Sequence, residues 1–479
     1  MVHAVHWIIG LLNIALALVT AGHALLFKRD PRAAWGWISI CLIFPLGGPL
    51  LYLLFGINRV RTRAKRLTRR LPFLYYFTSP ERPEVPVRVK PGLDLPVECR
   101  ELAAISEAVS RRPLVMGNAV EAFYNGEEAF PAMLEAVEGA EESLYLATYI
   151  LESNATGRSF IDALGRAKDR GVDVRVLLDG IGELYSFSRP GRLLKERGVP
   201  VAKFMPPTLI PPSFNINLRN HRKILAADGR VAFVGGMNIG DRHLVSAVEN
   251  PRRVKDVQFR TAGPVVGQIE EVFLEDWAFA TGAPEPPRAF HLPPPAGDAV
   301  CRTIVDGPNE DLDKLAVIMV GAASAAKRRI QIMTPYFLPS REMIGTLQAA
   351  SLRGVEVDVV LPGLNNLPFV HRATRNMLWE LLQWGIRAFY QPPPFVHTKL
   401  FIVDEHYLHV GSANLDPRSL RLNFELVVET FDPHLAARMA AFVDACRYRS
   451  RQISLQEVDG RPLGTRLLDS GAWLLSPYL

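Results

Sequence analysis

Apolar positions divide the chain into an N-terminal part and a long remainder with a different pattern. Residues 7–27 and 33–56 are uncharged apolar runs, each long enough to cross a bilayer as a helix. From about residue 113 onward, short Val, Ile and Leu runs alternate with helical patterns. In residues 160–180, for example, we expect a helix, a turn and a strand. The pattern predicts an α/β protein preceded by a membrane helical hairpin.

The second apolar run contains helix-breaking residues near its middle. Pro45 and Pro49 remove backbone donors, and two glycines lie between them. We therefore expect this segment to be kinked or re-entrant, because a straight span needs an unbroken helix. A cleavable signal peptide is disfavoured, since a second apolar run follows the first at once. A buried hairpin of a soluble domain is the remaining alternative.

Charge changes this picture at one place. The formal net charge of the 479 residues is +6, but residues 57–70 alone contain seven Lys and Arg and no acid. Basicity confined to the end of a membrane segment is typical of the cytoplasmic side and attracts anionic lipid head groups. We therefore predict a multi-pass protein of the cell (inner) membrane, with its larger part in the cytoplasm and no nucleic-acid partner.

The α/β part repeats itself. Residues 343–363 align without a gap against 160–180, and residues 381–394 correspond to 193–207. Two βα units of the same pattern are expected to lie side by side, related by a pseudo-twofold axis. The last stretch, GAWLLSPYL, suits a membrane contact or ordinary core packing equally well. The predicted domains are a membrane hairpin (1–58), a basic segment and linker (59–112), two halves (113–290 and 291–455) and a tail (456–479).

Each half contains one copy of a motif, H-x-K-x4-D followed after six residues by G-[GS]-x-N. The second copy begins 176 positions after the first. A single H-x-K is most simply an exposed strand face, but two copies with identical spacing indicate one site built from two halves. Residues i and i+2 of a strand face the same way, so the His and Lys of each copy share a side. The motif residues are His221, Lys223, Asp228, Gly235, Gly236 and Asn238, and then His397, Lys399, Asp404, Gly411, Ser412 and Asn414.

These residue types suit a phosphate. Imidazoles supply a nucleophile and an acid, lysines and asparagines supply charge and donors, and glycines let backbone approach a ligand. We group Asp228 and Asp404 with the catalytic motif, although their odd spacing from the histidines favours an anchoring role in a turn. Four scattered cysteines form no zinc or disulfide pattern, and no carboxylate cluster resembles a two-metal site. No metal or cofactor is predicted.

The two motifs resemble the HKD signature of the phospholipase D superfamily. The contexts GGMNIGD and GSANLDPRSLRLNFE, with the apolar hairpin and basic run, look like the cardiolipin synthases within it. Gly236 stands where the fuller signature has Ser, and this Gly-Gly form points toward the synthase branch. The resemblance implies two phospholipase D-like α/β/α repeats around one active site. It also implies phosphatidylglycerol and anionic membrane lipids as partners.

The resemblance further implies a ping-pong reaction. His221 would attack a phosphodiester and form a phosphohistidine, and His397 would serve as acid and then base, although sequence symmetry alone does not decide between them. Phosphatidyl transfer between two phosphatidylglycerol molecules would give cardiolipin and glycerol. Another phosphatidyltransferase or a hydrolytic phospholipase D would use the same chemistry. A nuclease or a non-catalytic membrane scaffold is disfavoured.

A histidine that acts as nucleophile needs an acceptor on its other ring nitrogen. Asp256 and Glu425 lie in apolar strands downstream of the two motifs, where an unpaired carboxylate is unfavourable. The resemblance implies that each acid crosses to the other half, so that Glu425 orients His221 and Asp256 orients His397. The alternative is a pair of surface strand acids.

Overall fold

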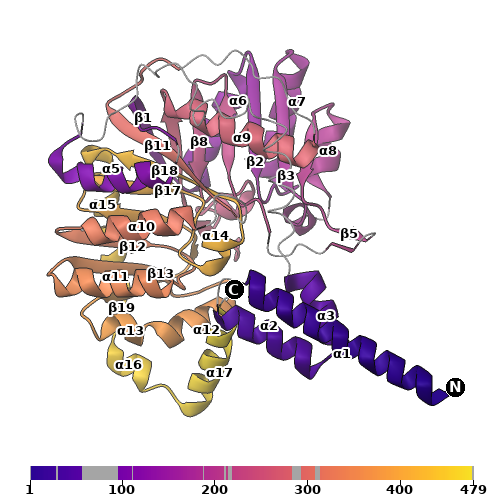
Figure 1. Ribbon diagram of the computed structural model, residues 1–479. Coiled ribbons are helices and arrows are strands. Elements are labelled where there is room, and N and C mark those ends of the chain that lie inside the picture. Colours follow the sequence, from indigo (N-terminus) through magenta and orange to yellow (C-terminus); the bar gives the residue numbers. More distant parts are fainter. Residues whose placement is uncertain are drawn as a thin grey trace. The chain divides into compact units, whose positions relative to one another are not determined.

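The computed structural model describes residues 2–28, 31–56, 95–110, 112–186, 188–209, 212–213, 218–282, 293–307 and 313–476 (Figure 1). They fall into two compact units. One contains the N-terminal helices with a short hairpin of β5 (Thr208–Leu209) and β6 (Pro212–Ser213). The other contains the α/β part. The predicted basic run at 57–70 lies outside the described residues.

The N-terminal unit begins with α1 (Val2–Phe27), which is long and apolar enough to cross a membrane from His6 onward. The second apolar run forms α2 (Pro31–Ile43), α3 (Gly47–Leu51) and a π-helical turn (Tyr52–Gly56). The helix is interrupted at Pro45, where the sequence predicts a kink. Because α2 is shorter than a bilayer is thick, this run does not form a second straight span.

The elements of the first half alternate between strands and helices, as the sequence predicts. They are β1 (Val115–Tyr124), α6 (Asn125–Glu138), β2 (Ser143–Thr148), α7 (Ala155–Asp169), β3 (Asp173–Asp179), a 3₁₀ helix (Gly182–Tyr185), α8 (Pro190–Glu196), β4 (Val201–Phe204), β7 (Ile224–Ala227), β8 (Val231–Gly235), a 3₁₀ helix (Asp241–His243), β9 (Val254–Lys255), β10 (Val257–Ala262) and α9 (Val265–Thr281).

The second half repeats this order and then adds a C-terminal extension. Its elements are β11 (Ala299–Asp306), α10 (Lys314–Ala325), β12 (Arg329–Met333), α11 (Arg341–Leu352), β13 (Glu356–Pro362), α12 (Pro368–Met377), α13 (Trp379–Leu382), β14 (Arg387–Gln391), β15 (Phe395–Val396), β16 (Leu400–Val403), β17 (Tyr407–Gly411), α14 (Pro417–Arg421), β18 (Glu425–Phe431), α15 (Pro433–Tyr448), β19 (Arg451–Ile453), α16 (Leu455–Asp459) and α17 (Leu463–Leu474).

One 15-stranded sheet runs through both halves. From the centre outward, the first half has the order β1-β10-β8-β7-β2-β3-β4, and the second has β11-β18-β17-β16-β12-β13-β14. The two orders match strand for strand, and the halves join where β1 pairs antiparallel with β11. This arrangement is the two-repeat α/β fold that the sequence predicts. Each motif begins at the N-terminus of an antiparallel strand, next to the carboxyl ends of two parallel strands.

Alternating side chains place helices on both faces of the sheet. In β2, Leu144 and Leu146 pack with the core under α6 and α7, whereas Tyr145 between them stacks on Phe273 of α9 at 4.9 Å. In β12, Gln331 likewise points away from its apolar neighbours and donates to a carbonyl of α15. The fold is therefore a three-layer α/β/α arrangement. Because the helices cover the faces of the sheet, the ends of the strands are available for a site.

Two segments that the sequence assigns to a linker and a tail are ordered helices. α5 (Val97–Val109) falls in the predicted linker, yet Cys99, Leu102 and Ala103 are buried in the core of the second half. Their helical spacing is hidden behind the Pro-rich, charged stretch that precedes them. The predicted tail contains α16 and α17, and α17 packs along α12 (Figure 1).

Candidate active site

The backbone of each motif histidine is held by the other half. The N–H of His221 donates to the carbonyl of Phe424 (2.9 Å), and the N–H of His397 donates to the carbonyl of Lys255 (2.7 Å). Each carbonyl belongs to the residue directly before the acid that the sequence assigns to that histidine. The two halves therefore exchange the same pair of contacts in opposite directions.

The side chains repeat this exchange. Nδ1 of His221 lies 3.0 and 3.1 Å from the two carboxylate oxygens of Glu425, and Nδ1 of His397 lies 2.9 Å from Oδ2 of Asp256. Both acids are buried. Because Nδ1 contacts the carboxylate, Nε2 is the ring nitrogen that can react with a ligand, and in His397 it lies 3.2 Å from Nζ of Lys399. These are the cross-half pairs that the sequence predicts, and their roles in catalysis stay predictions.

The two acids are both ionised but differ in their other partners. Burial by itself raises the pKa of each carboxyl, whereas the partner histidine and a nearby lysine lower it, and the resulting pKa lies below the ordinary value. Glu425 also accepts hydrogen bonds from Ser412 Oγ (2.5 Å) and Ser419 Oγ (2.6 Å). Asp256 accepts one from the N–H of Val257 (2.9 Å). Glu425 is therefore the more tightly enclosed of the two acids.

Both histidines are neutral before a ligand binds. Burial is the main cause that lowers the pKa of His221, and Glu425 opposes it. Burial, with the charge of Lys399, lowers the pKa of His397 to about 3. With Nδ1–H donating to a carboxylate, each neutral ring keeps a lone pair on Nε2. Such a ring can attack phosphorus or accept a proton.

The two lysines take the same position in each half. Nζ of Lys223 donates to the carbonyl of His221 (2.7 Å), and Nζ of Lys399 donates to that of His397 (2.6 Å). Nζ of Lys399 also lies 3.1 Å from Nδ1 of His397. Burial lowers the pKa of Lys223 to about 7 and that of Lys399 to about 8. The enclosed ammonium groups favour an anion as ligand.

The glycines at the ends of the motif strands serve strand packing. A Cβ atom at Gly235 or Gly411 would collide with the neighbouring strand. Strand packing by itself therefore requires glycine at these two positions, and the approach of the backbone to a ligand there stays a prediction. Gly236 differs, since a Cβ there would lie 2.9 Å from Oδ2 of Asp256 and 3.1 Å from Nζ of Lys399.

Each motif asparagine lies after the end of its motif strand and makes a hydrogen bond there. Oδ1 of Asn238 accepts from the N–H of Ile150 (3.2 Å), and the N–H of Asn414 donates to Ser419 Oγ (2.9 Å). Both side chains are buried. Their binding of a phosphate stays a prediction.

The two motif aspartates anchor turns at the other end of the strand from the histidines. Each has a positive φ and accepts three backbone N–H groups, which come from Glu141, Glu142 and Ser143 for Asp228 and from Lys327, Arg328 and Arg329 for Asp404. The odd spacing indicated this structural role. Their grouping with the catalytic residues stays a prediction.

Two tyrosines at the site were missed by the sequence analysis. The ring of Tyr149 lies edge-on to His221 at 5.4 Å, and that of Tyr336 lies edge-on to His397 at 6.3 Å. Each follows the second strand of its half, in LATYILES and MTPYFLPS. The repeat therefore contained the signal, because both halves place a tyrosine at this point.

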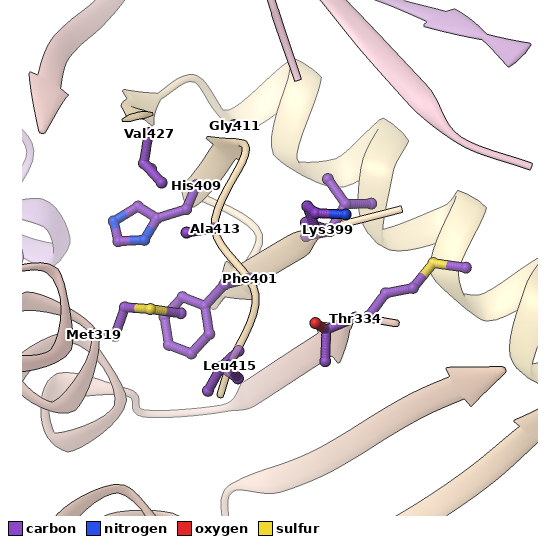
Figure 2. A pocket seen from close by; sticks show the side chains of 11 residues that line it. Met319, Thr334, Lys399, Phe401, His409, Gly411, Ala413, Leu415 and Val427 are labelled. Carbon is purple, nitrogen blue, oxygen red and sulfur yellow. The ribbon is translucent and has the colours of Figure 1, made fainter. Parts of the chain in front are cut away.

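A small cavity lies beside the site, within the second half (Figure 2). Figure 2 shows Met319, Phe401 and His409 toward one side of it and Thr334 and Lys399 toward the other. Its lining is largely apolar, and it is of a size for a water molecule, not for a phosphodiester. The cavity lies behind Lys399, so it is no binding site for a lipid head group.

The assembled residues suit an anionic phosphodiester. Two neutral imidazoles, each fixed by a carboxylate, lie with two buried lysines at the junction of the halves. In the part of the chain that the structure describes, no three or more His, Cys, Asp or Glu side chains gather as metal ligands would.

Comparison with known proteins agrees with this chemistry. A family model described as "Cardiolipin synthase, PLD-like domain" matches residues 133–277 and 319–446, which is more than half of the chain. The chain belongs to the cardiolipin synthase family. Another model, described as "Phospholipase D-nuclease N-terminal", matches residues 11–56 of this family member.

Full-length relatives support the same assignment. This cardiolipin synthase family member is 30% identical to the major cardiolipin synthase ClsA of Bacillus subtilis, over 98% of each chain. It is 29% identical to cardiolipin synthase A of Pseudomonas putida, over 99% of this chain and 98% of the relative. It is therefore an enzyme that transfers phosphate-containing groups, acts on phospholipids and belongs at a membrane.

A solved structure shows the same fold. The phosphatidylserine synthase of Haemophilus influenzae matches with a TM-score of 0.62 at 14% identity, over 79% of this chain and all of that one. At this identity the likeness concerns the fold alone, and it agrees with the two-half architecture.

Proposed function

We propose that this enzyme transfers a phosphatidyl group from one phosphatidylglycerol to a hydroxyl of a second, giving cardiolipin and glycerol. One observation carries the proposal. Each motif histidine is fixed at Nδ1 by a carboxylate from the other half, which leaves two Nε2 atoms for one phosphodiester. Full-length similarity to cardiolipin synthases supports the choice of substrate.

The first step transfers the phosphatidyl group to the enzyme. Nε2 of His221 attacks phosphorus, a P–N bond forms, and the bond from phosphorus to the glycerol oxygen breaks. His397 gives its proton to that oxygen, so glycerol leaves as a neutral alcohol. Glu425 stabilises the positive charge that develops on the His221 ring, because it already accepts from Nδ1.

His397 must be protonated for this step, although its ring is neutral in the empty enzyme. Burial and the positive charge of Lys399 lower the pKa of His397 in the empty enzyme. A bound phosphodiester adds a negative charge beside the ring and beside Lys399, and this charge favours the protonated form. The proton is therefore taken up when the substrate binds.

The second step returns the enzyme to its starting state. The hydroxyl of a second phosphatidylglycerol gives its proton to His397, its oxygen attacks phosphorus, and the P–N bond to His221 breaks. Cardiolipin leaves and both histidines are again ready for a donor. Lys223 and Lys399 balance the charge on the phosphoryl oxygens in both steps.

Incubating the purified full chain with phosphatidylglycerol alone in vesicles tests the proposal. We expect cardiolipin and free glycerol in equal amounts, and no product from the His221→Ala control. Phosphatidic acid as the main product would contradict the proposal, because water would then be the acceptor.

We also propose that both apolar runs lie in the membrane, so that the N-terminus and the α/β part share the cytoplasmic side. The basic run at 57–70 supports this orientation. Labelling in intact cells with a membrane-impermeant thiol reagent tests it. A cysteine added at the N-terminus and one in place of Thr68 should both stay unlabelled from outside, and labelling of either would contradict the topology.

A further inference from the structure

One exposed side of α17 consists of leucines and glycines. Leu463, Leu467, Leu468, Leu474 and Leu475, here called the leucine face, have exposed fractions between 49% and 72%. At helical spacing they cover one continuous side of the helix. An exposed apolar side of this kind is typical of a surface that contacts something apolar.

One charged residue of α17, Asp469, faces the protein instead of water. Asp469 is fully buried and accepts from Arg375 of α12 (2.6 and 2.7 Å) and from Arg461. Trp473 packs against the core of the second half. A helix on a water-facing surface has the opposite arrangement. The buried ion pairs therefore fix the leucine face outward, and core packing accounts for only part of the C-terminal apolar stretch.

The exposed apolar surface continues toward the active site. α17 lies along α12 (Figure 1), whose first turn exposes Phe369, and the loop before α12 exposes Leu364 and Leu367. This loop contacts the site directly, because the hydroxyl of Tyr336 donates to Oδ1 of Asn366 at 2.9 Å. The tyrosine beside His397 thus connects the active site with this surface.

The first half exposes apolar side chains at the equivalent position of the repeat. The segment after β3 exposes Leu184 and Tyr185, at the position in the repeat that the loop after β13 takes in the second half. The ring of Tyr185 lies 6.2 Å from that of Tyr149, the tyrosine beside His221. Both halves therefore place apolar side chains next to their own active-site tyrosine.

Charge near this surface favours an anionic partner. Arg375 is already paired with Asp469, but Arg372 of α12 is half-buried and Arg466 of α17 is exposed. Basic side chains beside exposed apolar ones are typical of segments that lie on anionic membranes.

We propose that the leucine face and the loops after β3 and β13 form one surface that rests on an anionic phospholipid bilayer and presents the active site to it. The proposal rests on the proposed function, because lipids with their acyl chains in a bilayer reach the histidines only if the surface around the active site meets the membrane. The continuity from α17 to Tyr336 favours a bilayer over a second copy of the chain.

Fluorescence quenching tests contact with the bilayer without using activity. In full chain carrying Cys446→Ser, a bimane label is placed on Leu467→Cys, and a matched label on Leu352→Cys, which is 68% exposed at the end of α11. In vesicles of phosphatidylglycerol with acyl-chain nitroxides, we expect strong quenching of the first label and little of the second. Equal quenching of the two labels would overturn the proposal.

Activity on two forms of the substrate tests the consequence. The Leu467→Glu/Leu474→Glu variant should be roughly tenfold or more less active on phosphatidylglycerol vesicles, with activity on monomeric short-chain phosphatidylglycerol kept. Leu352→Glu should match the parent on both. An equal loss on both substrates, or none on vesicles, would overturn the proposal.

Two further outcomes separate the alternatives. Disulfide cross-linking between Leu467→Cys chains, with no quenching by lipid, would assign the leucine face to a second copy and overturn the proposal. Quenching of the Leu467 label in an enzyme that makes no cardiolipin would support the surface while contradicting the proposed function.

Discussion

The two halves make the same contacts to their motif histidines, but the polar side chains around the two orienting acids differ. In both, the histidine N–H donates across the junction, the lysine donates to its own histidine carbonyl, and an acid of the other half contacts Nδ1. Around Glu425, two serine hydroxyls complete the enclosure. At the equivalent positions near Asp256, 176 residues earlier, stand Gly236 and the buried His243.

This difference suggests how a duplicated site acquires two roles. Glu425, held by Ser412 and Ser419, suits a histidine that must keep one orientation while a P–N bond forms. Asp256 has fewer neutral donors, and His397 is also in contact with Lys399, whose charge disfavours protonation until an anion binds. The surroundings therefore support His221 as the nucleophile and His397 as the proton carrier.

Exchanging the acids for amides should have the largest effect. Glu425→Gln and Asp256→Asn should each lower the rate of cardiolipin formation by roughly 100-fold. With a phosphatidyl donor whose leaving group is p-nitrophenol, which needs no proton, Asp256→Asn should release the first p-nitrophenol at nearly the parental rate, whereas Glu425→Gln should stay slow. Stopped-flow measurement of the burst separates the two. Equal slowing of both bursts would contradict the division of roles.

The pH dependence of kcat/KM should report the lysines of the free enzyme. Burial lowers the pKa of Lys223 to about 7 and that of Lys399 to about 8. As pH rises through these values, the site loses positive charge, and kcat/KM for the donor should fall. Arginine stays charged, so Lys223→Arg should move the midpoint of the fall toward the pKa of Lys399. An unchanged midpoint would contradict this assignment.

A smaller effect is expected from the residues that make the halves unlike. Ser412→Gly, which copies Gly236 into the second half, removes one hydrogen bond to Glu425 and should lower kcat by about fivefold. Gly236→Ser should also lower kcat, because its Cβ would lie 2.9 Å from Oδ2 of Asp256. Steady-state rates on the same vesicles check both. Parental rates for the two variants would show that this asymmetry has no consequence.

The smallest effect on the catalytic rate should come from the turn aspartates, which make the same contacts in both halves. Asp228→Asn and Asp404→Asn each weaken three hydrogen bonds to backbone N–H groups, which should lower the free energy of unfolding by about 1–3 kcal/mol. Activity per folded molecule should stay near the parental value in both. Thermal unfolding and active-site titration measure the two quantities. A large loss of kcat without a loss of stability would place these residues in the catalytic group.

Much of this architecture could be predicted because the same sequence pattern occurs in both halves. The ungapped match of 343–363 to 160–180 predicts the repeat, and it corresponds to α11–β13 and α7–β3. A buried strand acid requires a partner, and the family resemblance implies that this partner is the histidine of the other half. The contact of Glu425 with His221 agrees with that expectation.

The remainder depends on contacts that no local pattern contains. α5 is preceded by a Pro-rich charged stretch, and its buried positions are explained only by the core of the second half. The outward leucines of α17 follow from the buried Asp469, whose partners lie 94 and eight residues away along the chain. Tyr149 and Tyr336 approach the histidines only when β2 and β12 lie beside the motif strands.

The most direct test of the central claim is trapping of the covalent intermediate by rapid denaturation in alkaline detergent. The p-nitrophenyl phosphatidyl donor, labelled with ³²P, is mixed with His221→Ala and His397→Ala enzymes. We predict acid-labile, base-stable label on His397→Ala enzyme, located at His221, and none on His221→Ala. Label on His221→Ala enzyme, located at His397, would contradict the account.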